Sequence, residues 1–334
     1  MTSGTLPLSA SSLGRVLVTG PSSASLSNMC GGWTLTWQGT PGDTWFTFGT
    51  TILAGITAQL TGSGAEVVHH EGCDIRGNYD QADFDATIAA AASSDVVIVA
   101  IGESTYAELP GDISDALLPA GQLDLVRALI ATGTPVVVVL VEGRPRLLGG
   151  AIDGAAAVIS AMLPCVEGGQ AIGEIIFGEV NPSGRLPYSY PLNPNDGPLQ
   201  YWHFVSAKDS FQWPFGTGLS YSNFVYSNLR LSASTVTPDD TLTVTVNVRN
   251  EGPYDGKVSV QIFQRDHYRS VVPEAKMLKG FEKIFLENGQ STDVSFALDL
   301  EDWSFIGLDN TKTYEAGDFD VMIGNLKATF TLVF

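Results

Sequence analysis

Residues 15–180 alternate between short runs of apolar, β-branched residues and longer stretches of helical character. The apolar runs are Arg15–Thr19, Glu66–His69, Asp95–Ile101, Pro135–Val141 and Ala156–Met162. The helical stretches between them are Thr51–Leu60, Phe84–Ala92, Gln122–Ala131 and Gly169–Phe177. Continuous apolar strands separated by helices predict a mostly parallel sheet covered by helices, an α/β sandwich. Because ligands of such sheets contact loops at the carboxyl ends of the strands, we expect the chemistry in the loops after Thr19 and Ile101.

The pattern changes from about Asn181 to Phe224, where the chain is rich in Pro, Asn, Gly and aromatic residues and has little periodicity. The aromatic content predicts an ordered connecting segment that packs against another part of the protein, not a flexible linker. We therefore divide the chain into an α/β domain at 1–190, a connecting segment at 191–224 and a β-domain at 225–334.

The last third of the chain has the period of β-structure. Thr241–Val248 alternates strictly, with Leu242, Val244, Val246 and Val248 on one face. Further predicted strands are Lys257–Gln264, Gly280–Phe285, Ser291–Leu298 and Phe319–Ile323. Short strands separated by turn signals such as NEGPYDG and ENGQ predict an all-β sandwich of roughly a hundred residues.

Composition and charge narrow the classes of partner. The 334 residues carry a formal net charge of −19, which argues against nucleic acid and an anionic membrane surface as partners. A neutral ligand such as a sugar would be neither attracted nor repelled by that charge. The simplest interpretation of the charge is that it keeps the protein soluble. No apolar run is long enough to span a bilayer, and the first residues, MTSGTLPLSASSLGRVLV, lack the pattern of a signal peptide.

Cysteine and glycine motifs predict neither a metal site nor a cofactor. Cys30, Cys73 and Cys165 form no CxxC pair, which argues against zinc. One disulfide with one free thiol, or three reduced thiols, both remain open. The chain has neither a GxxxxGK[ST] phosphate loop nor a GxSxG nucleophile elbow.

The segment CGGWTLTWQG, Cys30 to Gly39, is the first candidate for ligand binding. Indole rings stack on the apolar faces of sugars, and glycines allow the backbone to approach closely. The alternative is that Trp33 and Trp37 fill a core, as large aromatic residues usually do. The polar residues between and beside them favour at least one exposed indole.

The segment GESTYAELPGD, Gly102 to Asp112, is the second candidate, because it directly follows a predicted strand. It holds the carboxylates Glu103, Glu108 and Asp112. A retaining glycosidase needs a carboxyl that protonates the leaving oxygen and then accepts a proton from water. The alternative is a solvated acidic loop. In the third segment, VEGRP, Arg144 is expected to form a structural ion pair or to bind a sugar hydroxyl.

These segments, in this order, resemble the C-terminal half of glycoside hydrolase family 3. The matching strings are RVLVTGPSSASLSNMCGGWTLTWQG, GESTYAELPGD, GTPVVVVLVEGRPR, LPCVEGGQAIGEIIFGEVNPSGRLPYSYP and WPFGTGLSYSNFVYSNLRLS. The string DGKVSVQIFQRDHYRSVVPEAKMLKGFEKIFLENGQS resembles the family's fibronectin type III-like domain. The resemblance covers almost the whole chain and implies a β-glucosidase or exo-β-glucanase acting on a β-glucoside or β-glucan oligosaccharide.

The resemblance also implies roles for individual residues. In related family members the active site lies between a barrel, which carries an aspartate nucleophile, and the α/β sandwich, which carries a glutamate acid/base. The YAE of GESTYAELPGD implies Glu108 as acid/base, and Glu103 as a structural residue. The second tryptophan of CGGWTLTWQG implies Trp37 at the +1 subsite, beside Trp33.

The sequence departs from the family in having no barrel, of roughly 250 residues, before residue 1. The nucleophile is therefore expected from a family 3 barrel domain, either in the same full-length chain or in trans. We expect the isolated chain to show no more than trace activity, because one carboxylate cannot carry out a double displacement. A truncated gene, half of a split enzyme and accessory domains produced alone are all consistent with this sequence. The family favours an extracellular or periplasmic location.

Two other functions remain open. The chain fits a non-catalytic carbohydrate-binding or scaffolding module, in which the α/β and β domains persist as a folded unit. A doubly wound nucleotide-binding domain is disfavoured by the lack of a glycine-rich phosphate loop. An apolar, aromatic face that awaits a barrel is also expected to promote self-association.

Overall fold

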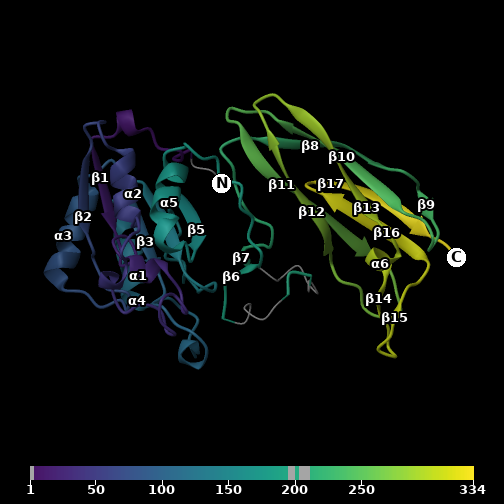
Figure 1. Ribbon diagram of the computed structural model, residues 1–334, viewed down its shortest axis with the longest axis horizontal. Coiled ribbons are helices and arrows are strands. Elements are labelled where there is room, and N and C mark those ends of the chain that lie inside the picture. Colours follow the sequence, from purple (N-terminus) through teal and green to yellow (C-terminus); the bar gives the residue numbers. More distant parts are fainter. Residues whose placement is uncertain (1–3, 195–199, 203–210) are drawn as a thin grey trace. The chain divides into compact units, whose positions relative to one another are not determined.

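Two units make up the chain in the computed structural model, which describes residues 4–194, 200–202 and 211–334 (Figure 1). The first unit comprises Met1–Val180 with Pro191–Pro194, and the second comprises Asn181–Tyr190 with Asn195–Phe334. Part of the predicted connecting segment, at 195–199 and 203–210, lies outside the described residues. Among the described helices, none has the length and apolar character needed to cross a membrane.

The first unit is built on a five-stranded sheet with the order β2-β1-β3-β4-β5. Its strands are β1 (Arg15–Thr19), β2 (Glu66–His70), β3 (Val96–Gly102), β4 (Val136–Val141) and β5 (Ala157–Met162). Every pairing between neighbouring strands is parallel. β3 and β4 are buried along their whole length, as their continuous apolar runs require in a sheet covered on both faces. The prediction of a parallel α/β sheet is confirmed.

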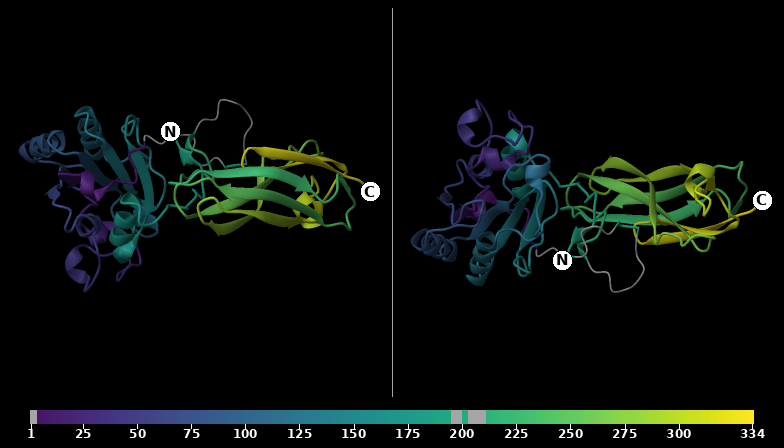
Figure 2. Two further views of the ribbon diagram at one scale, coloured as in Figure 1. Left: turned by 90° about the horizontal axis from the view of Figure 1, so that it is seen from above. Right: turned by 90° about the horizontal axis from the view of Figure 1, so that it is seen from below.

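Helices cover both faces of this sheet (Figure 2). They are α2 (Ile52–Gln59), α3 (Gln81–Ala92), α4 (Ala120–Ala131) and α5 (Gly168–Ile176). One face packs against α2 and α5 in a single apolar core that includes Ile56 and Ile172. The helices α3 and α4 contact each other and the strands from the opposite face.

Close packing of α2 on α5 explains the glycines at the start of α5. A Cβ atom on Gly55 would lie 1.9 Å from the carbonyl oxygen of Gly169, and one on Gly169 would lie 2.2 Å from that of Thr51. These glycines therefore allow the backbones of α2 and α5 to touch.

The strand order reverses between β1 and β3, because the chain moves from β1 outward to β2 and then returns to β3 on the other side. Loops that leave neighbouring strands in opposite directions open a crevice at this switch point, at the carboxyl ends of the strands. The loop after β1 contains α1 (Leu26–Met29) and a 3-10 turn at Asp43–Trp45. The loop after β3 contains a 3-10 turn at Leu109–Gly111.

The second unit is a β-sandwich, as predicted for the last third of the chain. One sheet has the order β13-β10-β8, and the other has the order β12-β11-β16-β17-β9. The strands are β8 (Phe224–Leu231), β9 (Thr235–Val236), β10 (Leu242–Asn250), β11 (Gly256–Asp266), β12 (Met277–Leu286), β13 (Ser291–Leu298), β16 (Gly317–Ile323) and β17 (Leu326–Leu332). Shorter elements are β6 (Tyr190–Pro191), β7 (Phe211–Trp213), α6 (Leu300–Trp303), β14 (Phe305–Ile306) and β15 (Lys312–Thr313).

The core of the sandwich follows the alternation in the sequence. Leu242, Val244, Val246 and Val248 are all fully buried, which confirms that they share the inner face of β10. Trp303, almost fully buried, closes the core with its ring 5.7 Å from that of Phe330. Large aromatic side chains of this kind contribute much of the apolar area buried in a small sandwich.

Candidate active site

Two loops from the switch point meet through a glutamine side chain. We call residues 30–40 the tryptophan loop and residues 102–112 the acidic loop. The Gln38 side chain accepts a hydrogen bond from the Ala107 amide at 3.0 Å and donates one to the Ala107 carbonyl at 3.0 Å. The side-chain amide thus pairs with one backbone residue as a neighbouring strand would. Since Gln38 follows Trp37 and Ala107 precedes Glu108, this pair places the two candidate residues on adjoining segments.

Glycines let the two loops approach to backbone contact. A Cβ atom on Gly32 would lie 2.2 Å from the Tyr106 carbonyl oxygen, and one on Gly39 would lie 2.7 Å from the Thr105 Cβ atom. No side chain fits at either position without displacing the acidic loop. The glycines of CGGWTLTWQG therefore serve the contact between the loops, in addition to any contact with a ligand.

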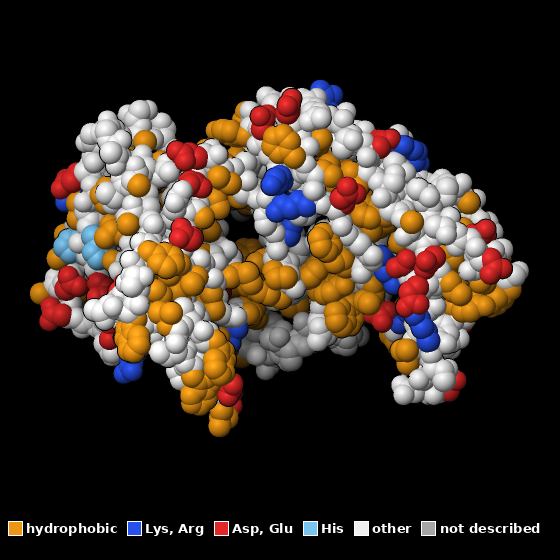
Figure 3. All heavy atoms as spheres, viewed as in Figure 1, with side chains coloured by type: hydrophobic (Ala, Val, Ile, Leu, Met, Phe, Trp, Pro, Cys, Tyr) orange, Lys and Arg blue, Asp and Glu red, His pale blue; other side chains and the backbone are white. Residues whose placement is uncertain are grey.

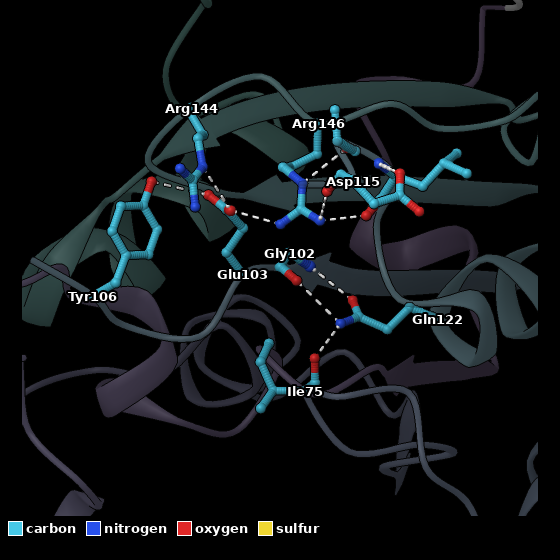
Figure 4. Close-up of polar contacts among 10 residues, drawn as sticks. Ile75, Gly102, Glu103, Tyr106, Asp115, Gln122, Arg144 and Arg146 are labelled. Carbon is cyan, nitrogen blue, oxygen red and sulfur yellow. Dashed lines mark hydrogen bonds and ion pairs between the residues drawn. The ribbon is translucent and has the colours of Figure 1, made fainter. Parts of the chain in front are cut away.

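Glu103 anchors the start of the acidic loop in a buried ion-pair cluster (Figure 4). Its Oε1 atom lies 3.0 Å from Arg144 Nε and 2.6 Å from Arg146 Nη1, and its side chain is only 4% exposed. Its Oε2 atom accepts a hydrogen bond from the Tyr106 hydroxyl at 3.2 Å. Glu103 is thus engaged by three side chains, and Arg144 forms the expected ion pair.

The two arginines differ in the other groups that they contact. Arg146 donates to the backbone carbonyls of Ala116 and Leu117, so its guanidinium also fixes the segment beyond the acidic loop (Figure 4). Arg144 lies over the Tyr106 ring, with its Cζ atom 4.2 Å from the ring centre. Burial, and then the negative charge of Glu103, raises the pKa of Tyr106 to about 12. The hydroxyl therefore stays protonated near neutral pH and can donate to Glu103.

A second glutamine fixes the other end of the loop. The Gln122 side chain accepts a hydrogen bond from the Gly102 amide at 2.9 Å and donates to the Gly102 carbonyl at 3.0 Å (Figure 4). It also donates to the Ile75 carbonyl at 2.7 Å, and it is fully buried. Gln122 and Gln38 thus clamp the acidic loop at Gly102 and Ala107, on either side of Glu103.

Glu108 lies just beyond these clamps and is exposed. Its carboxylate forms no hydrogen bond or ion pair with any described residue, in contrast to Glu103 earlier in the same loop. Its backbone has φ 53° and ψ −144°, a conformation that L-residues rarely adopt. Such strain costs about 1–3 kcal/mol and tends to occur at functional sites.

The tryptophans do not fill a core. Trp33 is 69% exposed and Trp37 is 49% exposed. The tryptophan loop is held internally by the Trp33 amide, which donates to the Trp37 carbonyl at 2.9 Å. Figure 3 shows hydrophobic side chains along the lower edge of this unit, where the carboxyl ends of the strands lie in the view of Figure 1. The alternative that both indoles are buried is therefore wrong.

Backbone strain gathers at this edge of the sheet. In the described part of the first unit, the non-glycine residues with positive φ are Trp33, Leu35, Glu108, Met162 and Cys165. All five lie at or beyond the carboxyl ends of β1, β3 and β5. The surrounding contacts must hold these conformations in place, which is the usual arrangement at a binding or catalytic site.

A cavity of about 280 Å³ lies beside the acidic loop. Its lining includes residues 102–106 together with Arg76, Gly111 and Arg144, whereas neither Glu108 nor Trp37 is among the described residues that line it. The described residues contain no cluster of three or more His, Cys, Asp or Glu side chains able to hold a metal ion. Sequence reasoning missed Gln38, Gln122 and Arg146, since no spacing relates them to their partners.

Comparison with known proteins identifies the family. Residues 2–221 match the glycosyl hydrolase family 3 C-terminal domain, and residues 258–327 match a fibronectin type III-like domain. The chain belongs to glycoside hydrolase family 3, which confirms the resemblance inferred from its motifs.

Relatives within the family include beta-glucosidases and beta-xylosidases. A lysosomal beta glucosidase of Dictyostelium discoideum is 41% identical over 335 residues, which cover 96% of this chain and 41% of the relative. A periplasmic beta-glucosidase of Salmonella typhimurium is 32% identical, covering 96% of this chain and 46% of the relative. The chain thus spans less than half the length of these two relatives.

Solved structures that match this chain are also beta-glucosidases. A beta-glucosidase from Erythrobacter marinus matches with a TM-score of 0.85 and 29% identity, over 99% of this chain and 48% of that one. A mutant beta-glucosidase from Listeria innocua in complex with laminaribiose matches with a TM-score of 0.85 and 26% identity, over 98% of this chain and 46% of that one.

Proposed function

We propose that this chain supplies the acid/base carboxyl and one wall of the aglycone site of a retaining, exo-acting β-glucosidase or β-glucanase. The observation that carries the proposal is the pairing of Gln38 with Ala107, which joins the segments bearing Trp37 and Glu108. In this proposal Glu108 protonates the leaving oxygen and then takes a proton from water, while Trp37 and Trp33 stack on the sugar.

The contrast between Glu103 and Glu108 supports this assignment. Glu103 is buried, and its carboxylate oxygens are already engaged by two arginines and the Tyr106 hydroxyl. Glu108 is exposed and has no partner among the described residues, so its carboxyl remains available for proton transfer. A proton-transferring group must lie within hydrogen-bond reach of the substrate oxygen, which only an unengaged carboxyl can do.

The rest of the catalytic machinery is proposed to come from a family 3 barrel domain, in the same full-length chain or in trans. The barrel would supply the nucleophile, because a double displacement needs a second carboxylate. A β-glucoside or β-glucan oligosaccharide is the proposed substrate. The names of the relatives, and the laminaribiose bound by one of them, support that choice.

The test is to add a family 3 barrel to the chain and assay hydrolysis of aryl β-glucosides. Glu108→Gln should lower the rate with poor leaving groups about 10²–10⁴-fold, the range of general acid catalysis. A dinitrophenyl glucoside, whose leaving group needs no proton, should be affected much less in the first step. Asp112→Asn, a change at another exposed acid of the same loop, is the control. Equal losses in both variants would refute the assignment, as would robust turnover by the isolated chain.

The alternative, a non-catalytic carbohydrate-binding module, is supported by the two exposed indoles. It predicts that the chain alone is retained on laminarin or cellulose and that Trp37→Ala weakens this retention. Retention without any activity when a barrel is present would favour the module. Equal retention of the wild type and Trp37→Ala would count against a sugar-facing Trp37.

A further inference from the structure

Two of the three cysteines lie side by side at the base of the tryptophan loop. The Sγ atoms of Cys30 and Cys165 are 2.9 Å apart, although 135 residues separate them in the sequence. Cys30 is fully buried at the end of α1, and Cys165 is half-buried in the turn between β5 and α5. Both are free thiols in the structure.

The contact between these segments is already formed on both sides of the sulfur atoms. A Cβ atom on Gly31 would lie 2.6 Å from the Leu163 side chain, and one on Gly168 would lie 3.2 Å from the Met29 side chain. The residues that flank Cys30 therefore pack against the residues that flank Cys165. A covalent bond here would join surfaces that are already in contact.

We propose that Cys30 and Cys165 are a site of disulfide formation, and that the bond ties the start of the tryptophan loop to the β5–α5 turn under oxidising conditions. The sulfur atoms need to approach by about 0.9 Å to reach the length of a disulfide bond, about 2.05 Å. Cys73, buried in the loop after β2, has no partner among the described residues and remains reduced. The proposed bond does not depend on the proposed function.

The oxidant is a small disulfide of the glutathione type, and the reaction proceeds in two exchange steps. The thiolate of Cys165, the more exposed of the pair, attacks one sulfur of the oxidant and releases one thiol. The thiolate of Cys30 then attacks the Cys165 sulfur and releases the second thiol. Two protein thiols lose two protons and two electrons in total, and one oxidised glutathione becomes two reduced molecules.

Burial and the neighbouring Cys165 thiol raise the pKa of Cys30 to about 12. The contribution of the Cys165 thiol ends once Cys165 is a mixed disulfide, but burial of Cys30 remains. The Cys30 thiolate is therefore scarce at neutral pH, and ring closure accelerates as the pH rises. Because this second step is slow, the mixed disulfide on Cys165 should accumulate before the internal bond forms.

The experiment exposes the full chain to oxidised glutathione at pH 7 and pH 9, then counts free thiols after unfolding and maps peptides without reduction. We expect the thiol count to fall from three to one, faster at pH 9, with Cys30 and Cys165 in one cross-linked peptide. Cys73→Ser should still form the bond, whereas Cys165→Ser should not. The midpoint of thermal unfolding should rise by several degrees on oxidation of the wild type and Cys73→Ser, but not of Cys165→Ser.

The outcomes that overturn the proposal are equally distinct. One is a native chain that keeps three thiols, or that stops at a mixed disulfide on Cys165. Another is a cross-link that includes Cys73. If Cys30→Ser fails to fold, Cys165→Ser still decides the question, because its side chain is only half-buried. This test measures free thiols, cross-linked peptides and thermal unfolding, and it does not measure glucosidase activity. Failure of the proposed function would therefore leave its result unaffected.

Discussion

Gln38 and Ala107 are joined by two hydrogen bonds of 3.0 Å each, across 69 residues of sequence. This pair connects the loop after β1 to the loop after β3, at the point where the order of the sheet reverses. Because it flanks both Trp37 and Glu108, it holds these two proposed site residues on adjoining segments. The geometry of the candidate site therefore depends on a residue with no chemical role of its own.

Replacing Gln38 by alanine should loosen the acidic loop. The change leaves the nearly buried amide and carbonyl of Ala107 without partners, at a cost of about 2–3 kcal/mol in the free energy of unfolding. Hydrogen exchange should show reduced protection of the Ala107 amide. Gln81→Ala, at an exposed helical glutamine, is the control, and equal exchange at Ala107 in both variants would contradict the assigned role.

The two arginines around Glu103 should differ in their effect on stability. Arg146→Ala removes a partner whose side chain is 10% exposed, so the remaining buried Glu103 charge should cost about 3–5 kcal/mol. Arg144→Ala should cost less, because its side chain is 32% exposed and water screens that pair. Urea unfolding of both variants measures the difference, and an Arg144 variant that is the less stable of the two would reverse this ranking.

Tyr106 should make stability depend on alkaline pH. The pKa of Tyr106 is raised from 10.0 to about 12 in the folded chain, mainly by burial and then by Glu103. The folded state thus holds the phenolic proton more tightly than the unfolded state. Its contribution to stability is present below pH 10 and is lost as the pH rises towards 12. Unfolding measured from pH 9 to 11.5 should show a decline that is smaller in Tyr106→Phe. Tyr221, whose pKa is also raised to about 12, contributes to the decline that remains in that variant.

Gly55→Ala should separate α2 from α5. The added Cβ atom would lie 1.9 Å from the Gly169 carbonyl oxygen, so the helices must move apart. Overpacking of this kind costs about 1–3 kcal/mol or more. Gly42→Ala is the matched control, because a Cβ atom there has nothing within 4 Å and its φ of 174° suits any residue. Equal thermal unfolding midpoints for the two variants would show that the close contact between α2 and α5 does not determine the stability of the fold.

Local sequence pattern was sufficient for most elements. The apolar run at β3 and the alternation at β10 predict their strands because a buried parallel strand and a half-buried sandwich strand impose different periods on the chain. β17 was missed although Leu326, Ala328, Phe330 and Leu332 carry the required alternation. β8 was missed because its exposed positions do not alternate. The motifs also sufficed to identify the family.

The amino-acid sequence by itself determined most of the strands and helices and where the loops with carboxylates and tryptophans begin. Its motifs, through the family resemblance, pointed to Glu108 and Trp37 as candidate site residues. Only the tertiary structure decided that Glu103 is buried between two arginines while Glu108 is exposed, and that Gln38 reaches Ala107. The physical reason is range. Hydrophobic periodicity is a property of residues that are close in the sequence. Ion pairs and side-chain hydrogen bonds between loops depend instead on which strands, distant in the sequence, lie side by side in the sheet.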